Sequence, residues 1–158
     1  MAREIERKFL VIGDRWRSLA PGKAYRQGYI ATAQPNRSVR VRIAGEKGYL
    51  TVKGPTYGLT RAEFEYEIPL QDAQEMLETL CDRPLIEKIR YCLPIGKVVW
   101  EIDEFLGENA GLIVAEVELA SENQLFERPD WLGKEVSSQS KYYNASLVNY
   151  PYSQWPKG

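Results

Sequence analysis

The chain has 158 residues, 44% hydrophobic residues and a formal net charge of −1, which fits one globular domain with a hydrophobic core. This charge balance gives no overall attraction to nucleic acid or to an anionic membrane, and no segment approaches the roughly 18 apolar residues of a membrane span. The sequence contains no histidine, which excludes Ser-His and Cys-His catalysis. The charged start and the two separate cysteines, Cys81 and Cys92, lead us to expect a cytoplasmic protein with free thiols.

The first predicted strand, Arg3–Val11, carries charged residues at alternate positions. Glu4, Glu6 and Lys8 project to one face, because successive side chains of a strand point to opposite sides. Two carboxylates and an ammonium group are costly to bury against apolar groups. They suit a polar cavity that holds a metal ion and an anion, although a solvated strand face with a local salt bridge would show the same pattern.

The same alternation returns in six later segments, most of which carry charges of one sign. The basic positions are Arg40, Arg42, Lys53, Lys88 and Arg90. The acidic positions are Glu63, Glu65, Glu67, Glu101, Asp103, Glu116 and Glu118. Each pair alone could be a solvated strand face, but such a face usually mixes polar residues without this order. We interpret the sorting as an acidic wall and a basic wall of one closed space.

Eight predicted strands follow one another at short spacing. In chain order they are 3–11, 25–31, 38–44, 49–53, 62–70, 85–93, 97–105 and 112–119. The apolar residues Ala73, Met76, Leu77 and Leu80 have helical spacing and predict a helix over Gln71–Leu80. Shorter helical segments are expected at 14–19, 121–126 and 141–149. The pattern indicates a mainly β protein with flanking helices, an antiparallel barrel or strongly curled sheet with the helices on its outer face.

Taken in order, these motifs resemble those of the CYTH family, the triphosphate tunnel metalloenzymes. The matching residues are E-x-E-x-K at Glu4, Glu6 and Lys8, R-x-R at Arg40 and Arg42, Lys53, the glutamates from Glu63, K-x-R at Lys88 and Arg90, Asp103, E-x-E at Glu116 and Glu118, and Lys141 before the last helix. The resemblance covers residues 3 to about 149. It implies one α+β domain over residues 1–158, folded as a closed eight-stranded antiparallel β-barrel that forms a charged tunnel.

Members of this family hydrolyse or cyclise triphosphate substrates with Mg²⁺ or Mn²⁺. The short form with Arg26-Gln27-Gly28-Tyr29 in its second strand is most similar to the inorganic triphosphatases. The resemblance implies a catalytic lysine–tyrosine pair at Lys8 and Tyr29. A class IV-type adenylyl cyclase and a thiamine triphosphatase of the same family stay open as alternatives.

The residue chemistry and the resemblance together assign roles within this tunnel. The expected phosphate-binding residues are Lys8, Arg40, Arg42, Lys53, Lys88, Arg90 and Lys141. The expected ligands of one or two Mg²⁺ or Mn²⁺ ions are Glu4, Glu6, Asp103, Glu116 and Glu118. A carboxylate such as Glu65 or Asp103 would orient the attacking water, Glu63 would line the tunnel, and the positions of Glu67 and Glu101 are left open. Neighbouring cations would depress the pKa of Lys8, and Tyr29 would form a hydrogen bond with it.

A non-catalytic binder of polyphosphate or nucleotide would need only the basic wall. It would gain nothing from four or more carboxylates that face its ligand, so we expect an enzyme. No purine-specific feature is visible, which favours hydrolysis over cyclisation. We expect a small-molecule triphosphate as the partner and neither nucleic acid nor membrane; a homodimer is left open.

Overall fold

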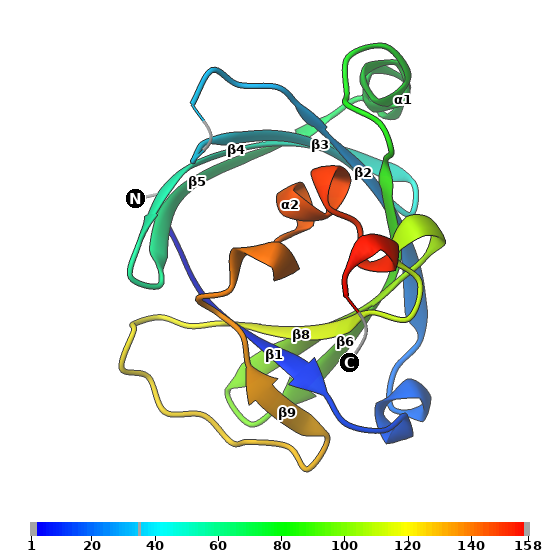
Figure 1. Cartoon of the computed structure of the whole chain (residues 1–158). Helices are drawn as coiled ribbons and strands as arrows, with labels where there is room; N and C mark the ends of the chain where they lie inside the picture. Colours follow the sequence, from blue (N-terminus) through cyan, green and yellow to red (C-terminus); the bar gives the residue numbers. More distant parts are fainter. Residues whose placement is uncertain (1–2, 35, 157–158) are drawn as a thin grey trace.

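The computed structural model describes residues 3–34 and 36–156, and its main feature is a closed antiparallel barrel of eight strands (Figure 1). The strands are β1 (Arg3–Val11), β2 (Gly22–Ile30), β3 (Ser38–Ala44), β4 (Lys47–Tyr57), β5 (Thr60–Ile68), β6 (Ile86–Ile95), β7 (Val98–Phe105) and β8 (Ile113–Glu118). They are arranged in the order β5-β4-β3-β2-β6-β7-β8-β1, and pairing of β1 with β5 completes the ring. The predicted eight-stranded barrel is confirmed.

The β4–β5 hairpin is longer than the sequence led us to expect. Residues 54–57 continue β4, although their glycine and proline predicted a loop. The ladder shifts register between Lys53 and Thr56, and Pro55 lies in this irregular stretch, where its missing N–H breaks no regular ladder bond. The turn comes at Gly58, whose φ of 64° is unfavourable for residues with a side chain.

Strand β1 has two successive partners along one of its edges. Its first residues, Arg3–Ile5, pair with β5, whereas Phe9 and Val11 near its end pair with β9 (Leu132–Glu135). Its other edge pairs with β8 throughout the stretch 6–10. The chain that follows β9 stays close to this seam, because Val136 donates its N–H to the carbonyl oxygen of Lys8 at 2.8 Å.

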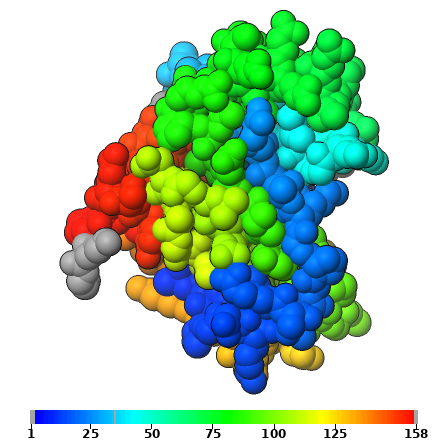
Figure 2. All heavy atoms as spheres, turned by 90° about the vertical axis from the view of Figure 1, so that its right-hand side faces the viewer, coloured from blue at the N-terminus to red at the C-terminus, as the bar shows by residue number. Residues whose placement is uncertain are grey.

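Helix α1 (Leu70–Thr79) packs on the outside of the barrel, as expected. Its buried residues Ala73 and Leu77 contact Val41 of β3, whose neighbours Arg40 and Arg42 point to the opposite face, into the lumen. The space-filling view shows this region at the top of the molecule and the C-terminal segment along its left edge (Figure 2). No helix within the described part of the chain is long and apolar enough to cross a membrane.

Helix α2 (Asn144–Asn149) lies where the sequence did not place it. Its buried residues Leu147 and Val148 belong to a hydrophobic cluster with Ile86 of β6 and Phe105 of β7. Ile86 shares its strand face with Lys88, and Phe105 shares its face with Asp103, so the helix packs against lumen-facing side chains. It covers one end of the lumen (Figure 1), and the prediction of an outer position is wrong for α2.

The structure confirms only some of the short helical segments that were predicted. The 3₁₀ helix η1 (Arg15–Ser18) falls within the segment predicted as helical at 14–19, and η3 (Ser140–Tyr142) overlaps the start of the one predicted at 141–149. The helix predicted over 121–126 is wrong, because this segment forms a turn and then a stretch without regular secondary structure. This stretch brings Phe126 to an aromatic cluster outside β1 and β7, where its ring packs edge-on against Phe9 and Trp100.

Candidate functional site

The barrel lumen contains a cavity of about 850 Å³ with charged walls. The predicted residues that line it are Glu4, Glu6, Lys8, Tyr29, Arg40, Arg42, Lys53, Glu63, Glu65, Lys88, Arg90, Glu101, Glu116 and Glu118. Several of them, including Glu4, Lys8, Arg40 and Lys88, are almost fully buried. The alternation of charges along the strands thus does mark one shared cavity.

Two residues that were predicted to belong to the site, Lys141 and Asp103, do not line this cavity. Glu67, whose position was left open, does not line it either. Lys141 is exposed, and its Nζ atom lies 4.5 Å from the ring centroid of Trp155. Glu67 lies at an exposed end of β5, 4.0 Å from Lys47. Asp103 is buried behind the wall, where it contacts basic residues.

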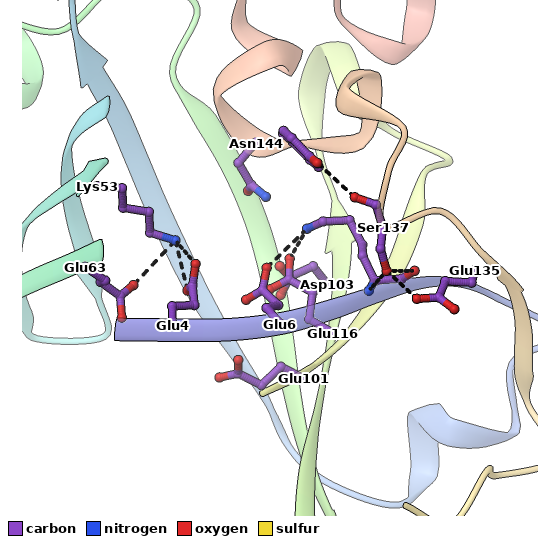
Figure 3. Close-up of polar contacts among 12 residues, drawn as sticks. Glu4, Glu6, Lys53, Glu63, Glu101, Asp103, Glu116, Glu135, Ser137 and Asn144 are labelled. Carbon is purple, nitrogen blue, oxygen red and sulfur yellow. Dashed lines mark hydrogen bonds and ion pairs between the residues drawn. The ribbon is translucent and has the colours of Figure 1, made fainter. Parts of the chain in front are cut away.

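The acidic wall is built mainly by β1 and β8. Lys8 stands opposite Glu116 in the β1–β8 ladder, and Glu6 stands opposite Glu118. Lys8 Nζ donates a hydrogen bond to Glu116 Oε1 at 2.5 Å and lies 3.9 Å from Glu6 Oε1. Figure 3 shows Glu4, Glu6 and Glu116 gathered along β1. Since directly opposite like charges destabilise a sheet, the Glu6–Glu118 pair is not explained by stability.

A lysine of β4 reaches the same wall from the other side of the seam. Lys53 Nζ donates to both carboxylate oxygens of Glu4 at 3.1 Å and lies 3.4 Å from Glu63 Oε2 (Figure 3). The ammonium group therefore bridges the two strands that close the barrel, β1 and β5. It neutralises only part of the acidic wall, because Glu6 and Glu118 are not among its partners within the described residues.

The state of Lys8 differs from the prediction. Burial alone would lower the pKa of Lys8, but the carboxylates of Glu116 and Glu6 outweigh it and raise this pKa above its usual range. The expected depressed pKa is wrong, because the charges nearest to Lys8 are anions rather than cations. The expected partner also differs, since the Tyr29 hydroxyl accepts a hydrogen bond from Gln27 Nε2 at 3.0 Å. The aromatic ring near Lys8 Nζ, at 6.0 Å, is that of Tyr143.

The basic wall is built by β3 and β6 around one buried carboxylate. Asp103 accepts hydrogen bonds from Arg90 Nε at 2.7 Å, from Arg90 Nη2 at 2.8 Å and from Lys88 Nζ at 2.7 Å. Burial would raise the pKa of Asp103, but Arg90 and Lys88 hold it below its ordinary value. Both carboxylate oxygens of Asp103 thus accept hydrogen bonds from cations, and Asp103 orients the basic wall. Its predicted role as a metal ligand has no structural support. Glu101, two residues earlier on the same face of β7, lines the cavity instead.

Strand β2 contributes uncharged residues that the sequence analysis did not select. The ring of Tyr25 lies 4.9 Å from the guanidinium carbons of both Arg42 and Arg90. Gln27 Oε1 accepts a hydrogen bond from Arg42 Nε at 2.8 Å. Neither residue carries a charge that would stand out in the sequence, but both share the strand face of Tyr29, and that parity could have identified them.

The basic wall is short of anions. Burial, together with Arg40 and Arg90, lowers the pKa of Arg42 to about 10. Burial also lowers the pKa of Lys88 well below its usual range, and Arg90 adds to this effect although Asp103 opposes it. Arg40 Nε is buried without a hydrogen-bond partner among the described residues. A bound anion would relieve this repulsion and satisfy this donor.

The acidic wall is correspondingly short of cations. Burial, Glu116 and Glu4 raise the pKa of Glu6 well above its usual value. Burial, Glu4 and Glu63 also raise the pKa of Glu118. Within the described ranges no three His, Cys, Asp or Glu side chains already converge as a metal site, so ligands would have to turn towards an ion. The donor set consists of carboxylates alone, which fits a hard divalent cation such as Mg²⁺ or Mn²⁺.

Comparisons with known proteins agree with this fold and lumen. The CYTH domain model matches residues 2–152 of the chain. The inorganic triphosphatase of Acetivibrio thermocellus is 53% identical over 155 residues, which cover 98% of this chain and 99% of that relative. The inorganic triphosphatase of Nitrosomonas europaea is 36% identical over 153 residues, which cover 92% of this chain and 96% of that relative.

Solved structures give the same result. The crystal structure of an inorganic triphosphatase superposes with a TM-score of 0.66 at 31% identity, over 100% of this chain and 99% of that chain. A Hippeastrum protein, described as a putative adenylyl cyclase with a dominant triphosphatase activity, has a TM-score of 0.58 over 75% of this chain and 80% of its own, and its 16% identity shows a shared fold alone. From the barrel, its charged lumen and a domain match that spans nearly the whole sequence, we conclude that this chain belongs to the CYTH family.

Proposed function

We propose that this protein hydrolyses inorganic tripolyphosphate and that it requires a divalent cation, Mg²⁺ or Mn²⁺. One observation carries the proposal: in the lumen cavity, a basic wall short of anions faces an acidic wall short of cations. A metal–triphosphate complex supplies both missing charges at once. The inorganic triphosphatases at 53% and 36% identity support this choice of substrate.

The basic wall would bind and neutralise the phosphate chain. Arg40 and Arg42 can donate paired N–H groups to phosphate oxygens, while Lys88 and Arg90 are held in place from behind by Asp103. Lys8 lies at the junction of the two walls and would contact the phosphate chain as a cation. Offsetting the charge of the substrate is the main requirement of phosphoryl transfer, which needs little covalent chemistry from the protein.

The acidic wall would hold the metal. Glu6, Glu116 and Glu118 are the best placed, because they are adjacent in the β1–β8 ladder and their side chains share the lumen. Glu4 would join them if Lys53 turned to the substrate. When bound, one or two cations would neutralise phosphate oxygens and lower the pKa of a water molecule. Glu65 of β5, which lies 3.8 Å from Arg40 of β3 across the intervening strand β4, would accept a hydrogen bond from the attacking water.

The decisive experiment is a phosphate-release panel on the purified protein. Tripolyphosphate, thiamine triphosphate, ATP and pyrophosphate are each supplied with Mg²⁺ or Mn²⁺, and cyclic AMP is measured in parallel. We expect tripolyphosphate to be cleaved fastest by a wide margin. Cyclic AMP as the main product from ATP would indicate a cyclase, faster cleavage of thiamine triphosphate would indicate that substrate, and binding without turnover would indicate a non-catalytic binder.

A further inference from the structure

Two uncharged amides connect the basic side chains of the lumen to the helix that covers its end. Gln27 on β2 is fully buried, and Asn144 is the first residue of α2. Gln27 Oε1 accepts from Arg42 Nε at 2.8 Å, and Gln27 Nε2 donates to Asn144 Oδ1 at 3.2 Å. The same Asn144 oxygen accepts from Lys88 Nζ at 2.9 Å. Arg42 and Lys88, which stand on different strands, are thereby joined through a bridge of two neutral side-chain amides, those of Gln27 and Asn144.

The direction of each hydrogen bond in this bridge is fixed by chemistry. Arginine and lysine can only donate, so the oxygen of Gln27 must face Arg42 and the oxygen of Asn144 must face Lys88. The remaining amide nitrogen of Gln27 then has to point away from Arg42, where it meets Asn144 and the Tyr29 hydroxyl. The bridge has one consistent arrangement, which gives both amides a defined orientation.

The bridge leaves particular donors free for a ligand. Because Nε of Arg42 is engaged by Gln27, the outer edge of the guanidinium, with its two terminal nitrogens, stays available for a phosphate. Lys88 Nζ has three donors, of which Asp103 and Asn144 engage two. The third is available to a ligand in the cavity that Lys88 lines.

Neutral acceptors have a physical advantage over carboxylates at these two positions. An amide oxygen orients a cation through its dipole but does not cancel the positive charge that attracts the substrate. A carboxylate would form an ion pair with Arg42 or Lys88 and compete with the phosphate for the same charge. Asp103 already pairs with Lys88 and Arg90, and Glu101 lies 3.2 Å from Arg90. A further carboxylate at Arg42 or Lys88 would leave the wall much less basic.

We propose that Gln27 and Asn144 are positioning residues that aim Arg42 and Lys88 at the triphosphate without neutralising them. The inference rests on the proposed function of the cavity. It also gives α2 a second role, since the helix that packs Leu147 and Val148 into the barrel end contributes a group that orients the binding wall.

The test uses two isosteric variants that add a negative charge, Gln27→Glu and Asn144→Asp. Each keeps an oxygen for its cation and adds an ion pair to the basic wall. Gln27→Glu also removes the N–H groups that Asn144 Oδ1 and the Tyr29 hydroxyl accept, so the melting temperature is compared for Asn144→Asp, whose Nδ2 donates no side-chain hydrogen bond within the described residues. We expect KM for tripolyphosphate to rise at least tenfold in both variants with a smaller change in kcat, while the melting temperature of ligand-free Asn144→Asp stays equal to that of the wild type or rises. The matched control is Asn149→Asp, which adds the same charge at an exposed position of α2 and should leave KM unchanged.

The inference is overturned if Gln27→Glu and Asn144→Asp keep the KM of the wild type. It is also overturned if the higher KM of Asn144→Asp comes with a lower melting temperature, which would show a merely structural role. Calorimetric binding of tripolyphosphate with Ca²⁺ separates this result from the fate of the proposed function. If the wild type binds tripolyphosphate without cleaving it, the proposed function fails, and the inference is then judged by whether both variants weaken binding tenfold. Absence of binding by the wild type overturns both.

Discussion

Replacement of Arg42 by alanine should selectively impair the use of tripolyphosphate. Arg42 is 8% exposed, its Nε is engaged by Gln27, and its terminal nitrogens are available to the substrate. Two charge-assisted hydrogen bonds at ~1.5–3 kcal/mol each amount to ~3–6 kcal/mol of transition-state binding. At about 1.4 kcal/mol per factor of ten, kcat/KM should fall roughly 10²- to 10⁴-fold.

A graded variant tests the same reasoning. Arg42→Lys keeps the positive charge but cannot bind Gln27 and two phosphate oxygens together. It should lose about one charge-assisted bond, so that kcat/KM falls roughly 10- to 10²-fold, between the wild type and Arg42→Ala. Steady-state kinetics of tripolyphosphate cleavage at fixed metal concentration measure the three proteins under the same conditions.

The control for this series is Arg7→Ala, one residue away from Lys8 but on the outer face of β1. Arg7 forms two hydrogen bonds with Glu135, at 2.9 and 2.6 Å, and packs on the rings of Phe9 and Phe126. Its loss should lower stability by about 1 kcal/mol and leave kcat/KM nearly unchanged. Equal losses of activity in Arg7→Ala and Arg42→Ala would refute the assignment of strand faces on which the site depends.

Four further results are expected. Chelation of divalent cations should abolish tripolyphosphate cleavage and added Mg²⁺ or Mn²⁺ should restore it; full activity in excess EDTA would contradict the metal site. Tripolyphosphate with Ca²⁺ at a hundredfold excess over Kd should stabilise the fold by ~2.7 kcal/mol and raise the melting temperature by roughly 5–11 °C, whereas saturating ligand without any shift would argue against binding in the lumen. The pKa of Glu6 is raised in the folded protein, so the stability from its bound proton is complete below the ordinary carboxyl pKa and is lost as pH rises through the raised pKa. In urea titrations across that pH window, Glu6→Gln should therefore gain stability relative to the wild type, although it loses turnover. A stability difference that does not change with pH would be the contrary result. Hydrolysis in ¹⁸O-water should place one heavy oxygen in released phosphate with no phosphorylated protein, because direct attack by water needs no protein nucleophile.

The strand faces could be predicted from the sequence because successive side chains of a strand alternate between its two faces. Once Glu4 and Arg40 are assigned to the lumen, Glu6 and Arg42, two positions further along, must face the lumen too, and both line the cavity. Strand ends were less certain, as the extension of β4 past Gly54 shows, since local turn residues compete with pairing to a neighbouring strand.

Other features depended on contacts between distant segments. The pKa of Lys8 is set by Glu116, which stands opposite it only because of the β1–β8 register. Asp103 carries the same charge as the cavity glutamates, and only the structure shows that Arg90 and Lys88 engage it. Gln27 has no charge to attract notice. The two adjacent apolar residues of α2 fit an inner or an outer surface equally well, so its place at the barrel end could not be read from its sequence.

The seam of the barrel has a consequence for the order in which the chain can fold. The first strand pairs Arg3 with Ala62, Glu6 with Glu118 and Phe9 with Glu135, so its partners are synthesised long after it. Pairings between such distant segments form slowly, and on the ribosome β1 can complete its pairing only after β8 and β9 have emerged. Its lumen face of glutamate and lysine is well suited to that delay, because charged side chains keep an unpaired strand hydrated and resist aggregation. The residues that make the mature lumen polar would thus also protect the nascent chain until the ring closes.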